Sequence, residues 1–275
     1  MPVDAEVVIV GGGPVGLATA IGLRTEGFDV LVVDRARPPI DKACGEGLMP
    51  DGVEELRRLG IRLAEIEHQP LRGIRYLEED LVAEASFAHV EGAGVRRTTL
   101  HRALVDRAAG IGVRMAWGST VRGLEGDRIA TDGGYLKSDW IVGADGLHSR
   151  VRTWTGLENP RIRFRRHGVR RHYRVSPWTD HVEVYWADGC EAYVTPVADD
   201  RVGVAILWSG NKADFEGLLG RLPSLNRRLR GAAPCSRHRG AGQLEQRTRG
   251  VEASTGVHRA CGTCLGDHES ARRIR

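Results

Sequence analysis

One stretch near the start of the chain constrains the fold more than any other. The β-branched run 7–10 is typical of a strand buried in a parallel sheet, and it leads directly into the glycine-rich stretch 11–16. An apolar run, 17–23, then predicts a helix. Strand, GxGxxG turn and helix in this order predict an α/β domain with a Rossmann-like fold.

The residues of this turn have separate roles. Gly11 permits the tight turn, Gly13 lets the backbone approach a pyrophosphate, and Gly16 lets the helix pack closely on the strand. Because the helix begins beside Pro14, the N–H groups of its first turn attract phosphate. The sequence therefore predicts a dinucleotide-binding turn formed by Gly11, Gly13, Pro14 and Gly16.

A second strand follows at the expected distance and ends in an acid. The run 30–33 is again apolar and largely β-branched, and Asp34 and Arg35 come directly after it. An acid at this position can hold the ribose hydroxyls of adenosine, and it would repel the 2′-phosphate of NADP. We therefore expect Asp34 and Arg35 at the adenosine end of the cofactor. The motif alone leaves the choice between FAD and NAD open.

Composition narrows the class of protein. With 275 residues, 41% of them hydrophobic, the chain can form one large domain or two smaller ones. No apolar stretch approaches the roughly 20 residues that a membrane-spanning helix needs, and the N-terminus lacks the features of a secretion signal. Five cysteines, an odd number, favour reduced thiols in a cytoplasmic protein.

The net charge of +4 is partly due to the arginine-rich run 161–174. Arginine alternates there in part with Ile162 and Phe164, which favours a strand with one solvated face. No nucleic-acid motif accompanies the run. We therefore predict no nucleic-acid partner.

The stretch 42–50, with the sequence KACGEGLMP, resembles the Lys-x-Cys-Gly-x-Gly loop of geranylgeranyl reductase-like flavoproteins. In that family the loop runs beside the isoalloxazine ring of FAD. The resemblance therefore implies that five residues lie near the flavin: Lys42, Cys44, Gly45, Glu46 and Gly47. Glycine and proline mark loops generally, so a surface loop with a partly buried cysteine is the alternative.

Two further motifs extend the resemblance. Arg97 begins a helix predicted over 97–110, and in the family this arginine contacts the cofactor. The stretch 140–152 is similar to the Gly-Ala-Asp-Gly-x-x-Ser-x-Val-Arg signature of FAD-dependent aromatic-ring hydroxylases. This similarity implies that Asp145 and Gly146 lie beside the FAD pyrophosphate and take part in NAD(P)H use. The Asp145 carboxylate could also cap the following helix, and the two roles are compatible.

The remaining chain predicts a second domain. Strands are expected at 182–186, 191–195 and 202–207, and a helix over 212–230 that Pro223 interrupts. The fold class is thus a Rossmann-like FAD-binding domain with an antiparallel β-sheet substrate domain. Four aromatic residues either line an apolar pocket or form plain core: Trp178, Trp186, Tyr193 and Trp208.

The predicted domain boundaries follow from these motifs. The FAD-binding domain takes 1–70 with 97–158, the substrate domain takes 71–96 with 159–246, and 247–275 is an irregular tail.

The family pattern stops short of the C-terminus. Relatives continue with a strand and a Gly-Asp-Ala segment whose acid holds the ribityl chain, whereas 247–275 has neither strand nor helix period. We therefore leave Asp267 unassigned. We expect the C-terminal part of the flavin domain to be missing through truncation or frameshift, with weak FAD binding. The CxxC pair at 261–264, with His258 and His268, lacks a second closing pair for zinc, and we predict no metal.

Together the motifs predict an FAD-dependent oxidoreductase driven by NAD(P)H. Its substrate would be a small apolar or aromatic molecule, either hydroxylated or reduced at an isolated double bond. Cys44 favours the reductase branch as a candidate near the flavin, and no residue is assigned as catalytic. Two alternatives stay open: a flavin- or nucleotide-binding remnant without turnover, and a simple NAD dehydrogenase, which the 143–146 signature disfavours.

Overall fold

The computed structural model describes residues 4–157, 166–211, 213–236, 239–244, 253–254 and 257–261. Its internal contacts divide the chain into two compact units. Unit 1 comprises Met1–Arg37, Ala108–Glu158 and Arg249–Arg275, and unit 2 comprises Pro38–Arg107 and Asn159–Thr248.

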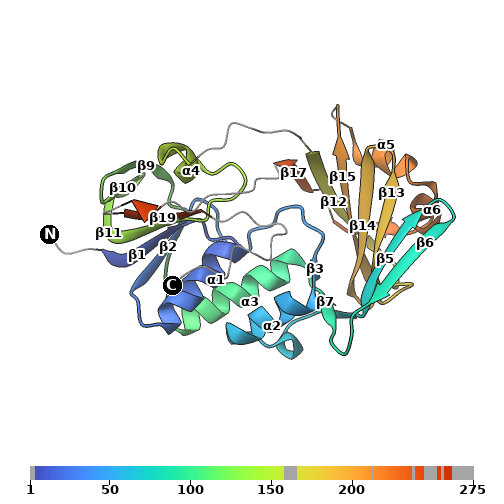
Figure 1. Ribbon diagram of the computed structural model, residues 1–275, viewed down its shortest axis with the longest axis horizontal. Coiled ribbons are helices and arrows are strands. Elements are labelled where there is room, and N and C mark those ends of the chain that lie inside the picture. Colours follow the sequence, from blue (N-terminus) through green and yellow to red (C-terminus); the bar gives the residue numbers. More distant parts are fainter. Residues whose placement is uncertain are drawn as a thin grey trace. The chain divides into compact units, whose positions relative to one another are not determined.

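Unit 1 is built on a sheet whose central strands are parallel (Figure 1). These strands lie in the order β11-β1-β2-β8, and β1 pairs with both β11 and β2. The first crossover helix lies against the sheet, as a Rossmann-like fold requires. The elements are β1 (Ala5–Val10), α1 (Pro14–Thr25), β2 (Val30–Asp34), β8 (Arg114–Trp117) and β11 (Gly134–Gly143).

Burial of β-branched side chains holds this sheet together. Val8, Val10 and Val33 share one core cluster with Ile141, so three adjacent strands contribute to it. Such continuous apolar strands are what a parallel sheet covered on both faces needs. The Rossmann-like prediction for the start of the chain is confirmed.

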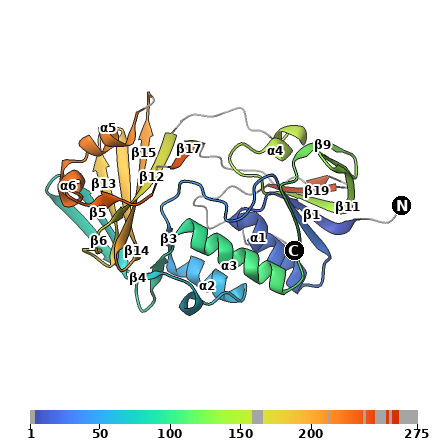
Figure 2. The ribbon, with the colours of Figure 1, turned by 180° about the vertical axis from the view of Figure 1, so that it is seen from behind.

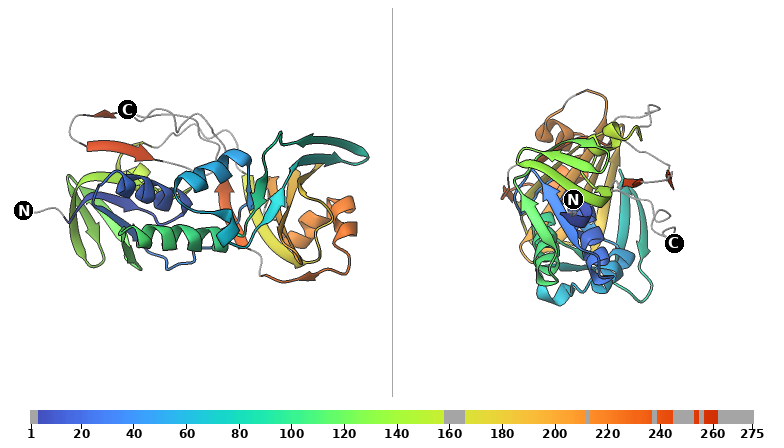
Figure 3. Two further views of the ribbon diagram at one scale, coloured as in Figure 1. Left: turned by 90° about the horizontal axis from the view of Figure 1, so that it is seen from below. Right: turned by 90° about the vertical axis from the view of Figure 1, so that its left-hand side faces the viewer.

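The strand β11 pairs with further strands along both halves of its length. Its first half forms an antiparallel hairpin with β10 (Arg128–Thr131), which pairs in turn with β9 (Val121–Glu125). Its second half pairs in parallel with β19 (Val257–Cys261), and β19 forms a short hairpin with β18 (Ala253–Ser254) (Figure 3). Both strands fall in the segment 247–275, for which the sequence analysis expected an irregular tail, and the structure describes no other residues of that segment. Backbone pairing to a free sheet edge needs no apolar alternation in the added strand. Asp267, Cys264 and His268 lie outside the described residues.

Unit 2 contains a larger sheet in the order β12-β15-β14-β13-β5-β6 (Figures 1 and 2). The pairings are antiparallel from β12 to β13, β5 joins β13 in parallel, and β6 returns antiparallel. This is the antiparallel sheet that the sequence predicts. The strands are β5 (Gly73–Glu78), β6 (Leu81–Ser86), β12 (Arg166–Arg174), β13 (His181–Ala187), β14 (Cys190–Ala198) and β15 (Arg201–Ser209). Two short strands, β16 (Ala233–Pro234) and β17 (Arg239–Leu244), also pair with β12.

Two short helices cover one face of the unit 2 sheet (Figure 2). They are α5 (Phe215–Gly220), capped by the Asp214 carboxylate, and α6 (Pro223–Arg228). Leu218 and Leu225 are fully buried in the core that these helices form with the sheet. The single interrupted helix predicted over 212–230 is thus two helices, because Pro223 takes the first position of a new helix, where its missing N–H costs nothing.

The solvated face expected for the arginine-rich run is wrong for its described part, β12, whereas Ile162 and Phe164 lie outside the described residues. Val169 and Tyr173 point into the helix-covered core, and Arg170 and His172 alternate to the opposite face. That face is also covered, because Arg170 is 2% exposed and His172 is completely buried. Two acids described below, Asp41 and Glu46, compensate the charge of Arg170.

A smaller sheet and three helical segments complete unit 2. The contacts place 38–70 and 97–107 in this unit, whereas the sequence analysis put both in the FAD-binding domain. Pairing of the Gly47–Leu48 strand with a strand of the intervening segment explains the difference. The elements are β3 (Gly47–Leu48), β4 (Gln69–Leu71) and β7 (Gly92–Gly94), the helices α2 (Pro50–Arg58) and α3 (Arg97–Gly110), and the 3-10 turn η1 (Leu63–Glu65).

Three general features of the described part of the chain bear on function. No helix in it is long and apolar enough to cross a membrane. Within the same residues, no group of histidine, cysteine, aspartate and glutamate is arranged to hold a metal ion. Cys44, Cys190 and Cys235 are free thiols.

Candidate functional site

The glycine-rich turn of unit 1 is tightly packed at its two ends. Gly11 has φ +113°, a conformation that favours glycine, and a Cβ there would lie 2.3 Å from the Ala144 carbonyl oxygen. A Cβ at Gly16 would lie 1.9 Å from the Gly11 carbonyl oxygen. The turn therefore packs both on itself and on the 143–146 stretch, so the structure brings two of the predicted motifs together.

The middle of the same turn is open. A Cβ at Gly13 would meet no described atom within 4 Å. Gly13 precedes α1, whose first turn begins at Pro14 and receives no side-chain cap. An open backbone position at the start of a helix has the form that a phosphate group needs for close approach.

The Asp34 carboxylate is fixed by the backbone around it. One of its oxygens accepts a hydrogen bond from Gly12 N at 2.7 Å, and the other accepts one from Ala36 N at 2.7 Å. A Cβ at Gly12 would lie 2.2 Å from the Trp117 ring, so a larger residue there would have to displace that ring. The side chain of Arg35 is exposed. Asp34 is thus held at the carboxyl end of β2, where ligands of open parallel sheets bind.

The short helix α4 (Arg150–Trp154) has Ser149 as its N-cap residue, and the Asp145 carboxylate binds further N–H groups of its first turn. This carboxylate accepts hydrogen bonds from the Ser149 hydroxyl and from the backbone N–H groups of Arg150 and Val151. Gly146, with φ +85°, makes the turn that follows Asp145. The capping alternative raised by the sequence is therefore present, and it leaves the cofactor role of Asp145 as a prediction.

In unit 2 the predicted flavin loop is anchored by Glu46. Its carboxylate lies 2.5 Å from Arg170 Nη1 and 2.6 Å from His172 Nε2, and it accepts the backbone N–H of Arg97 at 2.8 Å. Arg170 also pairs with Asp41 at 2.9 Å. The loop is therefore tied to β12 and to the start of α3 by buried, charge-assisted hydrogen bonds.

Further contacts fix the backbone of the loop. Thr195 on β14 donates its hydroxyl to the Gly45 carbonyl oxygen at 2.7 Å. Gly47 pairs with Gly94 between β3 and β7. A Cβ at Gly94 would lie 1.7 Å from the Pro196 carbonyl oxygen, so β7 and β14 approach each other as only glycine allows.

The other loop residues differ in environment. Lys42 is exposed. Burial raises the pKa of the Cys44 thiol, and the nearby Glu46 carboxylate acts in the same direction. Cys44 is therefore a protonated thiol near neutral pH and is no activated nucleophile. Arg97 Nε is buried and has no hydrogen-bond partner among the residues that the structure describes.

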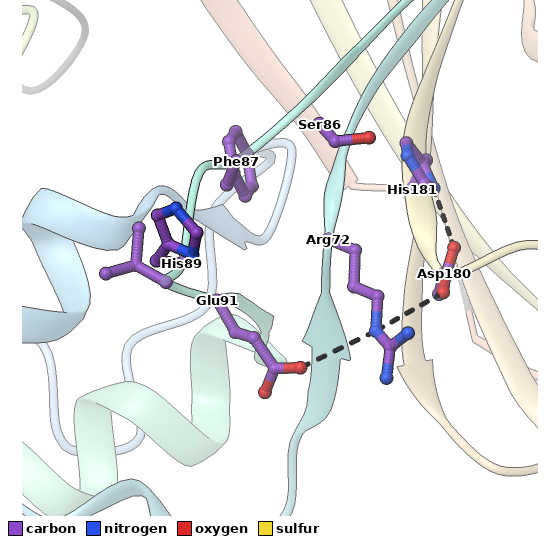
Figure 4. Close-up of a pocket in the computed structure, with 8 residues that line it drawn as sticks. Arg72, Ser86, Phe87, His89, Glu91, Asp180 and His181 are labelled. Atoms are coloured by element: carbon purple, nitrogen blue, oxygen red, sulfur yellow. Dashed lines mark hydrogen bonds and ion pairs between the residues drawn. The ribbon is translucent and has the colours of Figure 1, made fainter.

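A separate open pocket of about 790 Å³ lies beside β6 and the start of β13 (Figure 4). Arg72 extends between Glu91 and Asp180, with ion-pair distances of 3.6 and 3.7 Å. Asp180 also accepts from His181 Nδ1 at 2.6 Å, if that nitrogen carries the proton. The lining residues are Arg72, Ser86, Phe87, His89, Val90, Glu91, Asp180 and His181.

The four aromatic residues named by the sequence do not converge on one cavity. Trp208 belongs to the core under α5 and α6, and Trp178 packs against that core and donates its indole N–H to Glu183. Tyr193 packs with a different cluster of the sheet. Trp186 is 50% exposed and contacts Tyr76 edge to face.

Comparison with known proteins decides the family. A model of the FAD binding domain matches residues 4–214. The chain belongs to the FAD-binding domain family. Menaquinone reductase from Mycobacterium tuberculosis (strain H37Rv) is 30% identical over 230 residues, which are 75% of this chain and 56% of that protein. Rifampicin monooxygenase from Rhodococcus hoagii is 31% identical over 157 residues, which are 54% of this chain and 33% of that enzyme.

Solved structures agree on the fold of this FAD-binding family member. The flavin-dependent halogenase CmlS has a TM-score of 0.79 at 20% identity, covering 94% of this chain and 53% of that one. At this identity the likeness shows the fold alone. The chain spans 56% of the length of the menaquinone reductase that it matches.

The structure also identifies residues that hold the predicted flavin loop and that the sequence analysis missed. Arg170 and His172 hold Glu46, and Thr195 holds Gly45, yet all three lie on predicted strands far along the chain. The one available signal was the alternation of Arg170 and His172, which puts two polar side chains on the same face of a strand.

Proposed function

We propose that this chain is the FAD-binding part of an oxidoreductase that takes hydride from NAD(P)H. The observation that carries the proposal is the turn at 11–16, where Gly11 and Gly16 are closely packed while Gly13 faces open space. Together with Asp34, this geometry suits the adenosine diphosphate half of FAD. When bound, the flavin would supply the hydride chemistry, and the protein would bind it, orient it and exclude water.

The named residues would share the work of binding. In unit 1, Gly11, Gly13, Pro14 and Gly16 would receive the pyrophosphate, and Asp34 and Arg35 would hold the adenosine. Asp145 and Gly146 would lie beside the pyrophosphate, in addition to the helix cap that Asp145 provides.

In unit 2 the loop would lie beside the isoalloxazine ring through Lys42, Cys44, Gly45 and Gly47, whereas the Glu46 side chain binds to β12. Arg97, whose buried Nε has no partner among the described residues, would contact the cofactor. The high pKa of Cys44 suits a neutral neighbour of the ring better than a covalent role.

The substrate proposed is a small apolar or aromatic molecule. Reduction of a double bond is favoured by the loop around Cys44 and by the menaquinone reductase relative. Hydroxylation is the second candidate, and the rifampicin monooxygenase relative supports it. In both cases NAD(P)H would be the electron donor.

Anaerobic spectroscopy of the FAD-loaded protein tests the proposal. Addition of NADH or NADPH should bleach the flavin absorbance, and an unsaturated isoprenoid quinone should restore it without oxygen. Restoration only on adding oxygen together with a phenolic compound would favour hydroxylation. A protein that binds FAD but is reduced by neither nucleotide would be a remnant without turnover, and one that binds NAD but no FAD would refute the proposal.

A further inference from the structure

We propose that Glu46 is a positioning residue, which sets the backbone of the 42–50 loop without contacting the flavin itself. The inference rests on the proposed function only in taking this loop as the flavin-facing one. Glu46 was grouped with the cofactor-binding residues on its motif, and its surroundings assign it a different task.

The Glu46 carboxylate forms its hydrogen bonds with residues of unit 2. One oxygen accepts from Arg170 Nη1 and from the Arg97 backbone N–H, and the other lies 2.6 Å from His172 Nε2. Only 1% of the side chain is exposed. A buried carboxylate with three donors has no surface left for a cofactor, and its charge is compensated by Arg170.

Residues on three adjacent strands of the unit 2 sheet surround this carboxylate and its loop. His172, Gly203 and Thr195 are register partners across β12, β15 and β14. His172 contacts Glu46, Thr195 donates to the Gly45 carbonyl oxygen, and a Cβ at Gly203 would lie 3.0 Å from Glu46 Oε2. One cross-strand row therefore holds two consecutive loop residues, and the glycine in its middle leaves room for them.

The backbone of Glu46 needs such support. Its φ of 60° lies in the left-handed region, which is strained for a non-glycine residue and persists only where the surroundings fix it. The loop also accepts the Val95 N–H at the Glu46 carbonyl oxygen, at 2.8 Å. Through its side chain, Glu46 stabilises the first turn of α3, where a negative charge is favourable.

Hydrogen bonds on both sides fix the orientation of the His172 ring. The Ser236 hydroxyl oxygen accepts the His172 backbone N–H at 2.9 Å and lies 3.0 Å from His172 Nδ1. His172 Nε2 lies 2.6 Å from Glu46 Oε2, and it donates there because a carboxylate only accepts. We therefore assign His172 as a donor that orients the carboxylate.

The test uses Glu46→Gln, with Glu183→Gln as the matched control. Glu183 is another fully buried carboxylate of the same unit, and its three donors are Arg75, Trp178 and Tyr185. Hydrogen exchange of the Val95 and Arg97 amides is measured first, because it needs no flavin. We expect it to rise about tenfold or more in Glu46→Gln and to stay unchanged in Glu183→Gln.

The second readout separates positioning from general loss of stability. In FAD-loaded protein, Glu46→Gln should shift the visible flavin spectrum and slow flavin reduction about tenfold, with the FAD dissociation constant changed less than about threefold. Glu183→Gln should leave the spectrum unchanged. If the wild type shows no flavin reduction, the proposed function fails, and the hydrogen-exchange result still decides the role of Glu46.

If Glu46→Gln does not fold, two variants of His172 test the inference instead. His172→Gln retains a side-chain N–H donor and should keep slow exchange at Arg97, whereas His172→Leu should not. Wild-type exchange in a folded Glu46→Gln, or equal exchange in the two His172 variants, would overturn the inference. So would a large loss of FAD affinity in Glu46→Gln with unchanged exchange, because that result indicates direct contact.

Discussion

At the scale of single residues, the glycines of the turn at 11–16 differ in their role. Gly11 and Gly16 are needed for close packing in the fold, and we propose that Gly13 is needed for a ligand to approach. Gly13→Val should leave the protein folded, because no described atom lies near the added side chain. It should raise the dissociation constant for FAD about a hundredfold, because two hydrogen bonds to phosphate, of about 1.5 kcal/mol each, would be lost. Gly123→Val is the matched control, since Gly123 on β9 is equally open. Equal FAD affinity in the two variants, measured by fluorescence quenching, would contradict the role of Gly13.

A second residue-scale prediction concerns Cys44. Because burial raises the pKa of its thiol in the folded protein, the thiol form is favoured there. The stability this gives is present below the ordinary thiol pKa and is lost as pH rises through the higher folded value. At pH 8.5, iodoacetamide should therefore alkylate Cys44 about tenfold more slowly than the exposed Cys235, as followed by peptide mass spectrometry. Similar rates for both cysteines would show that Cys44 is not buried in solution.

At the scale of elements, close approach of two strands makes one glycine essential. In Gly94→Ala the new methyl group would collide with the Pro196 carbonyl oxygen, which belongs to rigid backbone. We expect a loss of about 1–3 kcal/mol in the free energy of unfolding, measured in urea. Gly123→Ala, on an open strand position, should change it by less than about 0.5 kcal/mol. Equal stability of the two variants would mean that β7 and β14 do not pack as described.

The sequence predicted individual elements, but it did not predict the contacts between distant elements. The strand-turn-helix at the start and the helix 97–110 follow from local patterns, and the structure has both. The loop anchor was missed because Glu46 lies 124 residues from Arg170 and 126 from His172, and local periodicity carries no information on such a pair. The solvated face assigned to β12 failed for the same reason, since an arginine facing a distant buried acid looks like a surface arginine.

At the scale of the whole molecule, family membership is shown, whereas the residues that hold FAD remain a prediction. The central claim is that the adenosine diphosphate half of FAD is the part held by the turn at 11–16 and by Asp34. The reasons are the open backbone at Gly13 and the fixed carboxylate at the end of β2.

Competition for FAD binding tests this claim most directly. The purified protein is titrated with FAD, followed by flavin fluorescence, in the presence of excess ADP or excess FMN. We expect saturable binding of FAD that ADP weakens and FMN leaves nearly unchanged, because FMN lacks the adenosine half. Displacement by FMN with no effect of ADP, or the absence of saturable FAD binding, would contradict it.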